Sequence, residues 1–137
     1  MMYTGLRRSE IASVEIDNNW ITLTTGKQRK GMKEKSRSLP ISPMLRKVLP
    51  FIDVEKIKTA PIRVLTDRIK DVFENHHLHD LRHTFITRAQ ECGIRREIVS
   101  LWAGHKADSS ITTTVYTHFQ ERSELQLQEM EKYNYKY

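Results

Sequence analysis

The sequence predicts an α+β domain that is mainly α-helical, with one small antiparallel β-sheet near the N-terminus. Three observations support this fold class. Apolar residues recur every three or four positions over much of the chain, which is the spacing of amphipathic helices. Residues 20–25 alternate and are rich in aromatic and β-branched side chains, as is typical of a strand. A length of 137 residues is enough for one domain with a hydrophobic core.

The small sheet is predicted to follow a short helix at residues 7–14, where apolar residues lie three positions apart. The Asp-Asn-Asn cluster at residues 17–19 is typical of a turn before the first strand. Residues 26–35 are polar and basic and are expected to form a hairpin tip. The return strand is predicted at residues 37–41. Pro40 places it at a sheet edge or ends it, because proline cannot donate a hydrogen bond to a neighbouring strand.

Specific residues mark where helices begin and end. Ser42 followed by Pro43 indicates a start, with serine as the N-cap and proline in the first turn. Asp80 is expected to cap a later helix, and Gly93 and Gly104 are expected to end two helices. The predicted helices cover residues 44–51, 66–74, 80–92, 95–102 and 121–132, with a short one from residue 108 that contains Tyr116.

The other segments are expected to be irregular. Residues 53–61 are interpreted as a linker and residues 75–78 as a loop that delivers His79. The tail at residues 133–137 is expected to fray. The helix at 80–92 is expected to pack through a stripe of four core residues: Leu81, Phe85, Ala89 and Cys92.

The chain is basic, with 23 lysines and arginines against 17 acidic residues and a net charge of +6. This balance suggests a polyanion partner, most commonly nucleic acid, although a merely basic soluble protein fits it equally well. The single cysteine, Cys92, excludes an internal disulfide and suits a reducing compartment. No apolar run approaches the roughly 18 residues that a membrane span needs, and no signal pattern is present. A cytoplasmic protein without membrane contact is therefore expected.

Two arginines are candidate phosphate ligands. Arginine stays charged and offers a planar fork of donors that matches two phosphate oxygens. Arg82 lies three residues after His79, so both are expected to face the same way on a helix, and Leu81 and Phe85 beside it are expected core residues. Arg7 lies far upstream. Two guanidiniums can bracket the non-bridging oxygens of a phosphate and stabilise the charge of a phosphorane.

Histidines and a tyrosine supply groups for proton transfer and attack. His79 and His105 can donate or accept protons near pH 7, and His105 follows a helix-ending glycine that exposes it at a turn. A structural role for either histidine remains open. Tyr116 is the candidate nucleophile, because nearby cations favour the phenolate; a packing role is equally open. Four other histidines are interpreted as loop or surface residues: His76, His77, His83 and His118.

The basic hairpin offers a general acid. A departing alkoxide needs a proton, and a lysine near other cations has a lowered pKa. Taken singly, each is more readily interpreted as a solvated turn residue. The candidates are Lys27, Lys30, Lys33 and Lys35.

Four short motifs, in this order, resemble the catalytic domain of the tyrosine recombinases, the phage-integrase family. Residues 4–10 (Thr-Gly-Leu-Arg-Arg-Ser-Glu) resemble the first box, in which Glu10 matches a supporting acid. Residues 79–82 (His-Asp-Leu-Arg) resemble the second box, and Ala-Gly-His at 103–105 the third. Val-Tyr-Thr-His at 115–118 resembles the nucleophile box. Each motif alone is unspecific, but the four in order cover nearly the whole chain.

The resemblance implies a tyrosine recombinase catalytic-domain fold and a metal-free transesterification through a 3′-phosphotyrosine, with no cofactor. Lys27 matches the family's catalytic lysine after the second strand, and Lys30 is its rival because the hairpin is longer than usual. Six catalytic residues are implied: Arg7, Lys27, His79, Arg82, His105 and Tyr116.

The resemblance also implies partners and domain limits. Double-stranded DNA is the expected substrate. The family acts as a tetramer on two duplexes, so the segment at residues 121–132 is expected to dock onto a neighbouring copy. Residues 1–137 are interpreted as one catalytic domain that lacks the family's N-terminal DNA-clamping domain and the first helix of the catalytic domain.

Three alternatives remain. A type IB topoisomerase shares the chemistry but relaxes supercoils alone. A non-catalytic helix-turn-helix module fits the helices at 80–92 and 95–102. A zinc hydrolase is a minor alternative, because His79 and His83 are four residues apart and echo H-E-x-x-H, although Asp80 stands in place of glutamate.

Overall fold

The computed structural model describes residues 1–24, 36–105 and 122–134. A three-stranded antiparallel sheet contains β1 (Glu15–Asp17), β2 (Trp20–Thr24) and β3 (Ser36–Pro40), in that order. The predicted hairpin partner of β2 is confirmed, and β3 is an edge strand that ends at proline. The predicted turn joins β1 to β2, with Asp17 paired to Trp20.

Two features before β2 differ from the prediction. The helix expected at residues 7–14 is a 3₁₀ helix, η1 (Arg8–Ser13), in which the carbonyls of Arg7 and Ile11 each accept a hydrogen bond from the N–H three residues later. Strand β1 was not predicted. Its sequence, Glu-Ile-Asp, alternates polar and apolar residues, but three residues are too few for this alternation to distinguish a strand from a helix or a turn.

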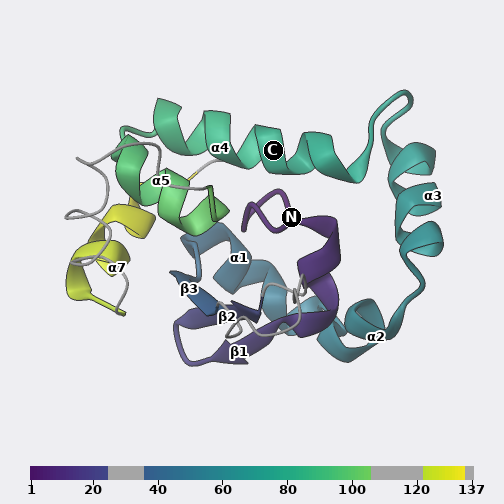
Figure 1. Ribbon diagram of the computed structural model, residues 1–137, viewed down its shortest axis with the longest axis horizontal. Coiled ribbons are helices and arrows are strands. Elements are labelled where there is room, and N and C mark those ends of the chain that lie inside the picture. The colour runs from purple at the N-terminus through teal and green to yellow at the C-terminus, as the bar shows by residue number, and fades with distance from the viewer. Residues whose placement is uncertain (25–35, 106–121, 135–137) are drawn as a thin grey trace, which may run out of the picture.

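Helices make up most of the described chain (Figure 1), and the long helix α4 runs along the opposite side of the N-terminal segment from the sheet and α1. The model is therefore mostly helical with one small sheet, which is compatible with the α+β class. The helices are α1 (Pro43–Val48), the 3₁₀ helix η2 (Leu49–Phe51), α2 (Val54–Thr59), α3 (Ile62–Val72), α4 (Leu78–Glu91), α5 (Arg96–Ala103) and α7 (Glu124–Glu131).

The sequence signals predicted most helix ends correctly. The Ser42 hydroxyl accepts a hydrogen bond from Leu45 N at 3.2 Å, which confirms it as the N-cap of α1. Gly93 and Gly104 have φ angles of +75° and +65° and follow α4 and α5 as predicted. Asp80 is not the N-cap of α4, because the helix begins two residues earlier. It occupies the third helical position, where its carboxylate accepts a hydrogen bond from His77 N at 2.7 Å.

Two predictions between the sheet and α4 were wrong. The expected linker contains α2, which is capped by Asp53 through a 2.9 Å hydrogen bond from Lys56 N. The next helix, α3, begins at Ile62 rather than at residue 66. Ile62 lies three residues before Leu65, so the apolar period of α3 extends one turn further toward the N-terminus than the prediction placed it.

The hydrophobic core lies between the sheet, α4, α5 and the C-terminal segment. Phe85 and Ala89 are fully buried, as predicted, whereas Leu81 and Cys92 are only half-buried. Tyr133 was expected to fray and instead is fully buried. Its ring centroid lies 5.1 Å from that of Phe85, and its hydroxyl donates to Met2 O at 3.0 Å. This aromatic contact fixes the chain after α7 to the N-terminal segment.

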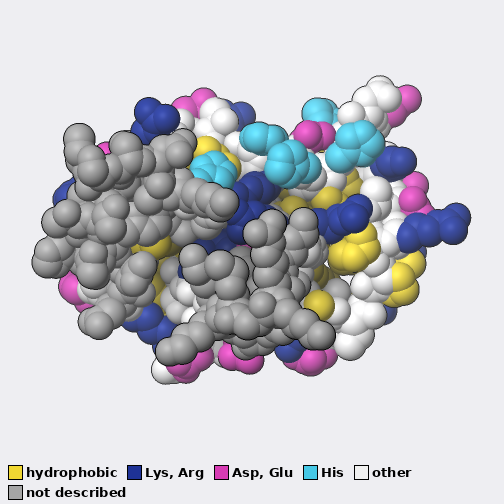
Figure 2. All heavy atoms as spheres, viewed as in Figure 1, with side chains coloured by type: hydrophobic (Ala, Val, Ile, Leu, Met, Phe, Trp, Pro, Cys, Tyr) yellow, Lys and Arg dark blue, Asp and Glu magenta, His cyan; other side chains and the backbone are white. Residues whose placement is uncertain are grey.

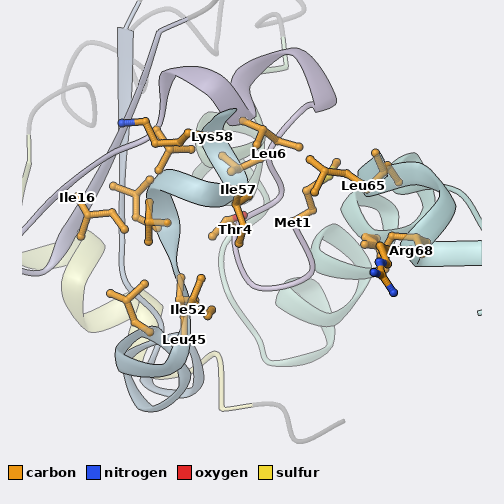
Figure 3. Close-up of a pocket in the computed structure, with 18 residues that line it drawn as sticks. Met1, Thr4, Leu6, Ile16, Leu45, Ile52, Ile57, Lys58, Leu65 and Arg68 are labelled. Carbon is orange, nitrogen blue, oxygen red and sulfur yellow. The ribbon is translucent and has the colours of Figure 1, made fainter. Parts of the chain in front are cut away.

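A second apolar region remains partly open (Figure 3). It is a groove of about 290 Å³ lined by the N-terminal segment, the sheet, α1, α2, α3 and α4, with Leu6, Leu45 and Leu65 among its residues. Thr4 lines it, and in the described chain its hydroxyl is the only buried side-chain polar atom without a hydrogen bond. No helix in the described ranges combines the length and apolar character that crossing a membrane requires.

Candidate active site

The C-terminal end of α5 gathers three arginines from distant parts of the chain. The last carbonyl groups of an α-helix have no partner within the helix and carry its negative dipole end, so they attract cations. The three final carbonyls each accept a hydrogen bond from a different guanidinium: Trp102 from Arg37 at 2.8 Å, Ala103 from Arg82 at 2.5 Å, and Gly104 from Arg7.

Arg82 is the most deeply placed of these arginines, at 3% exposed. It also donates to Gly5 O at 2.5 Å, which ties α4 to the N-terminal segment. Burial lowers the pKa of Arg82 to about 10, and the charges of Arg7 and Arg37 act in the same direction. Arg82 remains a cation at neutral pH, held in an environment that disfavours its charge.

Glu10 is the acidic partner of two of these arginines. Its side chain is fully buried and pairs with two arginines. Arg7 Nη1 lies 3.1 Å from Glu10 Oε1, and Arg37 Nη2 lies 2.8 Å from Glu10 Oε2. Burial would raise the pKa of Glu10, but the hydrogen bonds from Arg37 and from the Arg7 backbone N–H lower it. Glu10 is therefore a carboxylate, and the three guanidiniums and this carboxylate leave a net charge of +2.

His105 lies at the edge of this cluster. Gly104 turns the chain left-handed, and the backbone N–H of His105 closes the helix end by donating to Ser100 O at 3.0 Å. Burial lowers the pKa of His105, and the positive charges of Arg82 and Arg7 add to this effect. The imidazole is therefore neutral at pH 7, and such a ring can accept a proton or donate its N–H to an oxygen.

The lowered pKa of His105 makes stability depend on pH. Because the folded pKa lies below the unfolded value of 6.5, the unfolded chain takes up the proton first as the pH falls. The stabilising contribution is present above 6.5 and is lost as the pH falls through the folded pKa. We expect His105→Gln to make the fall in unfolding free energy between pH 7 and pH 5 shallower, as measured by urea titration.

His76→Gln is the matched control for this measurement, since His76 Nδ1 lies 3.6 Å from the Asp80 carboxylate rather than among arginines. It should not reduce the pH dependence in the same way. An equal reduction in both variants would mean that burial and the neighbouring arginines do not give His105 its own contribution to the pH dependence of stability.

His79 lies apart from the buried arginines. It was expected to face the same way as Arg82, but it is exposed, whereas Arg82 points inward. Residues three apart on a helix diverge by about 60°, which is enough to separate an exposed from a buried position. The His79 ring packs edge-on against His83, with centroids 4.5 Å apart. His83 is exposed as predicted, yet its charge also lowers the pKa of His105.

Figure 2 shows Lys and Arg side chains at the centre of one face, directly beneath histidine side chains that lie over α4. The structure thus brings together Arg7, Arg82 and His105. Lys27, Lys30 and Tyr116 lie outside the described residues, as do Lys33 and Lys35.

Arg37 is the member of the cluster that the sequence interpretation missed. It pairs across the sheet with Leu23, which is fully buried, and shares its face of β3 with buried Leu39. Because residues two apart on a strand point to the same side, Arg37 is directed inward. An arginine on the apolar side of a predicted strand was the available signal.

Two alternatives can be compared with this geometry. In α5, five of eight residues are buried, while Arg96 and Glu97 at its start are exposed, so the helix has one buried and one exposed face, as a recognition helix also has. Within residues 1–24, 36–105 and 122–134, no three His, Cys, Asp or Glu side chains form a group that could hold a metal ion.

No family model and no solved structure matches the chain. One curated protein does. The chain has a tyrosine recombinase-like relative. It is the tyrosine recombinase XerD of Lacticaseibacillus casei, 28% identical over an alignment of 146 positions that covers 86% of this chain and 48% of the relative. The chain thus spans about half the length of this relative, and the relationship is a distant one.

Proposed function

We propose that the chain is the catalytic domain of a site-specific recombinase that breaks and rejoins double-stranded DNA. The observation that carries this proposal is the gathering of Arg7, Arg37 and Arg82 at the end of α5, with His105 beside them. Arg7 is 39% exposed, so its fork can reach a ligand, whereas Arg82 supplies charge from below. A pair of such groups suits the two non-bridging oxygens of a phosphodiester.

The proposed reaction is a transesterification without a metal ion. The Tyr116 oxygen forms a bond to the scissile phosphorus, and the bond from phosphorus to the 5′ oxygen breaks. Lys27 gives its proton to the departing 5′ oxygen, with Lys30 as the alternative donor. Arg7, His79 and His105 contact the non-bridging oxygens, Arg82 stabilises their charge from beneath, and a neutral histidine takes the phenol proton. The 3′-phosphotyrosine keeps the ester bond until another 5′ hydroxyl reverses the step.

Self-association as a tetramer on DNA is part of this proposal, with one structural requirement. The buried side of α7 packs within its own chain, where Gln126 accepts a 2.8 Å hydrogen bond from the Trp102 indole and Met130 is 1% exposed. Docking of that side onto a neighbouring copy requires its release from this position.

A trapped covalent adduct tests the proposed function. The substrate is a pool of random-sequence duplexes with a sulfur atom in place of the scissile 5′ oxygen, because the departing thiolate cannot efficiently reverse the step. We expect a denaturant-resistant protein–DNA adduct in the presence of a chelator, mapped to Tyr116 by mass spectrometry. Tyr116→Phe should bind DNA and give no adduct. DNA binding by the unaltered chain without any adduct would favour a binding module instead.

The same substrate distinguishes the general acid from the phosphate ligands. A thiolate leaves without protonation, since its pKa is far below that of an alkoxide. Loss of the acid should therefore abolish reaction with the oxygen substrate and spare the sulfur substrate, whereas Arg7→Met should impair both. Comparing Lys27→Met with Lys30→Met identifies the acid. If neither variant shows this selective rescue, the acid is another residue.

A further inference from the structure

Arg37 is joined to both halves of the arginine cluster. Its Nε donates to Trp102 O at 2.8 Å, and its two terminal nitrogens donate to the two oxygens of Glu10. Its side chain is only 9% exposed, compared with 39% for Arg7. All three nitrogens of Arg37 thus have protein partners, and little of the side chain is accessible to a ligand.

Glu10 links Arg37 to Arg7, because its carboxylate accepts hydrogen bonds from both residues. One carboxylate oxygen accepts from both Arg37 and the Arg7 side chain, at 3.1 Å for the latter. The other accepts from Arg37 at 2.8 Å and from the Arg7 backbone N–H at 2.7 Å. A carboxylate held by a bidentate arginine has a fixed orientation, so the Arg7 groups bound to it are fixed as well.

Arg37 also lies against the turn that carries His105. A Cβ atom added to Gly104 would come within 2.8 Å of Arg37 Nη1 and 2.9 Å of its central carbon. The guanidinium therefore packs directly on the backbone between α5 and His105. Arg37, a single side chain from β3, thus contacts both Glu10, which holds Arg7, and the end of α5, which carries His105.

We propose that Arg37 is a positioning residue that sets the direction of Arg7 through Glu10 and the position of His105 through the end of α5. This inference rests on the proposed function, in which Arg7 and His105 contact the scissile phosphate. Arg37 itself contacts no substrate. It converts two separately anchored groups into one preorganised pair, which is the condition for stabilising charge in a transition state.

The test compares Arg37→Met and Arg37→Lys with the unaltered chain in the adduct assay. We expect single-turnover adduct formation to fall about 100-fold in Arg37→Met and about 10-fold in Arg37→Lys, because lysine cannot reproduce the two-pronged contact. DNA affinity should change by less than about threefold. The salt dependence separates the roles: Arg7→Met should make the slope of log K against log salt shallower by about 0.9, and Arg37→Met should leave it unchanged.

Arg46→Met is the matched control. Arg46 also bonds a carbonyl oxygen, Ile41 O at 3.3 Å, and a carboxylate, Glu131 at 3.1 Å, but it is 48% exposed and contacts none of the cluster. Its rate should equal that of the unaltered chain. Arg37→Met should cost less in the Glu10→Gln background than in the unaltered chain, because only the contact of Arg37 with the end of α5 is then left to lose.

Several outcomes would overturn the proposal. A control-like rate in Arg37→Met would show that Arg37 is not needed for the chemistry. A salt slope as shallow as that of Arg7→Met would mean that Arg37 is itself a phosphate ligand. If the double variant loses activity by the full product of the two single losses, Arg37 does not act through Glu10. If circular dichroism shows that Arg37→Met does not fold, the adduct rate and the salt slope of Arg37→Lys are used in its place. An inactive unaltered chain would instead contradict the proposed function.

Discussion

Replacing Arg82 by methionine is expected to lower adduct formation by about 100- to 1,000-fold, while changing the unfolding free energy by less than about 2 kcal/mol. The catalytic loss follows from removing a cation from beneath the proposed phosphate-binding position. Arg82 is 3% exposed, so water does not replace its charge there. A buried charge next to the reacting group acts through a lower dielectric than a surface charge does.

The small effect on stability results from two opposing terms. Methionine leaves the carbonyls of Gly5 and Ala103 without their donors, which costs about 1–3 kcal/mol for each buried group. It also removes a cation from an unfavourable position beside two other guanidiniums. The pKa of Arg82, lowered to about 10 by burial and by the neighbouring guanidiniums, corresponds to about 3 kcal/mol of unfavourable placement of the charge. The two terms nearly cancel, so this position favours function over stability.

Urea unfolding and the adduct assay together test this prediction. Arg88→Met is the matched control, because Arg88 is on the same helix, 37% exposed, and pairs with Glu91 at 2.8 Å. That variant should lose neither stability beyond about 1 kcal/mol nor activity. A loss of more than about 4 kcal/mol in Arg82→Met would show that the carbonyl bonds of Arg82 dominate and that its burial is structural.

The parts of this fold that could be predicted are those fixed by nearby residues. Ser42 caps α1 through a neighbour three positions away, and Gly104 ends α5 because it adopts a left-handed conformation. The short helix α2 escaped prediction because its six residues contain only one apolar pair at helical spacing, Val54 and Ile57, which is too short a pattern to identify a helix. Tyr133 escaped because its burial depends on Phe85 and Met2, which are distant in the chain.

The same distinction holds for the candidate site. The motifs singled out Arg7, Arg82 and His105, and the structure gathers these three at the end of α5. The end of α5 was predicted from Gly104, but the binding of three arginines to its carbonyls was not, because these arginines are distant in the chain. Arg37 was missed for a related reason. Its role depends on which face of β3 meets the core, and that register is set by pairing with β2.

Gly5→Ala is expected to destabilise the fold much more than Gly93→Ala. Both glycines have left-handed φ angles, +60° and +75°, which cost an alanine about 1–2 kcal/mol. They differ in their surroundings. A Cβ on Gly5 would lie 2.4 Å from a Phe85 ring carbon, whereas a Cβ on Gly93 would meet nothing within 4 Å.

Phe85 has little room to move away, because it is fully buried and packs against Tyr133. The clash adds about 1–3 kcal/mol of overpacking to the Gly5 variant. We therefore expect urea unfolding to give losses of about 1–2 kcal/mol for Gly93→Ala and about 2–5 kcal/mol for Gly5→Ala. Equal losses in the two variants would mean that the N-terminal segment yields and that Phe85 does not fix its position.

The Gly5 substitution also reaches the site, since Gly5 O accepts a hydrogen bond from Arg82. Displacing this backbone moves one of the two carbonyls that hold the guanidinium, so adduct formation should fall in Gly5→Ala and stay unchanged in Gly93→Ala. Adding Phe85→Leu to Gly5→Ala removes the ring that the new methyl group meets. If steric contact is the cause, the double variant recovers part of the adduct yield even though Phe85→Leu alone destabilises the core. If the yield stays low, the left-handed backbone of Gly5, rather than its contact with Phe85, positions Arg82.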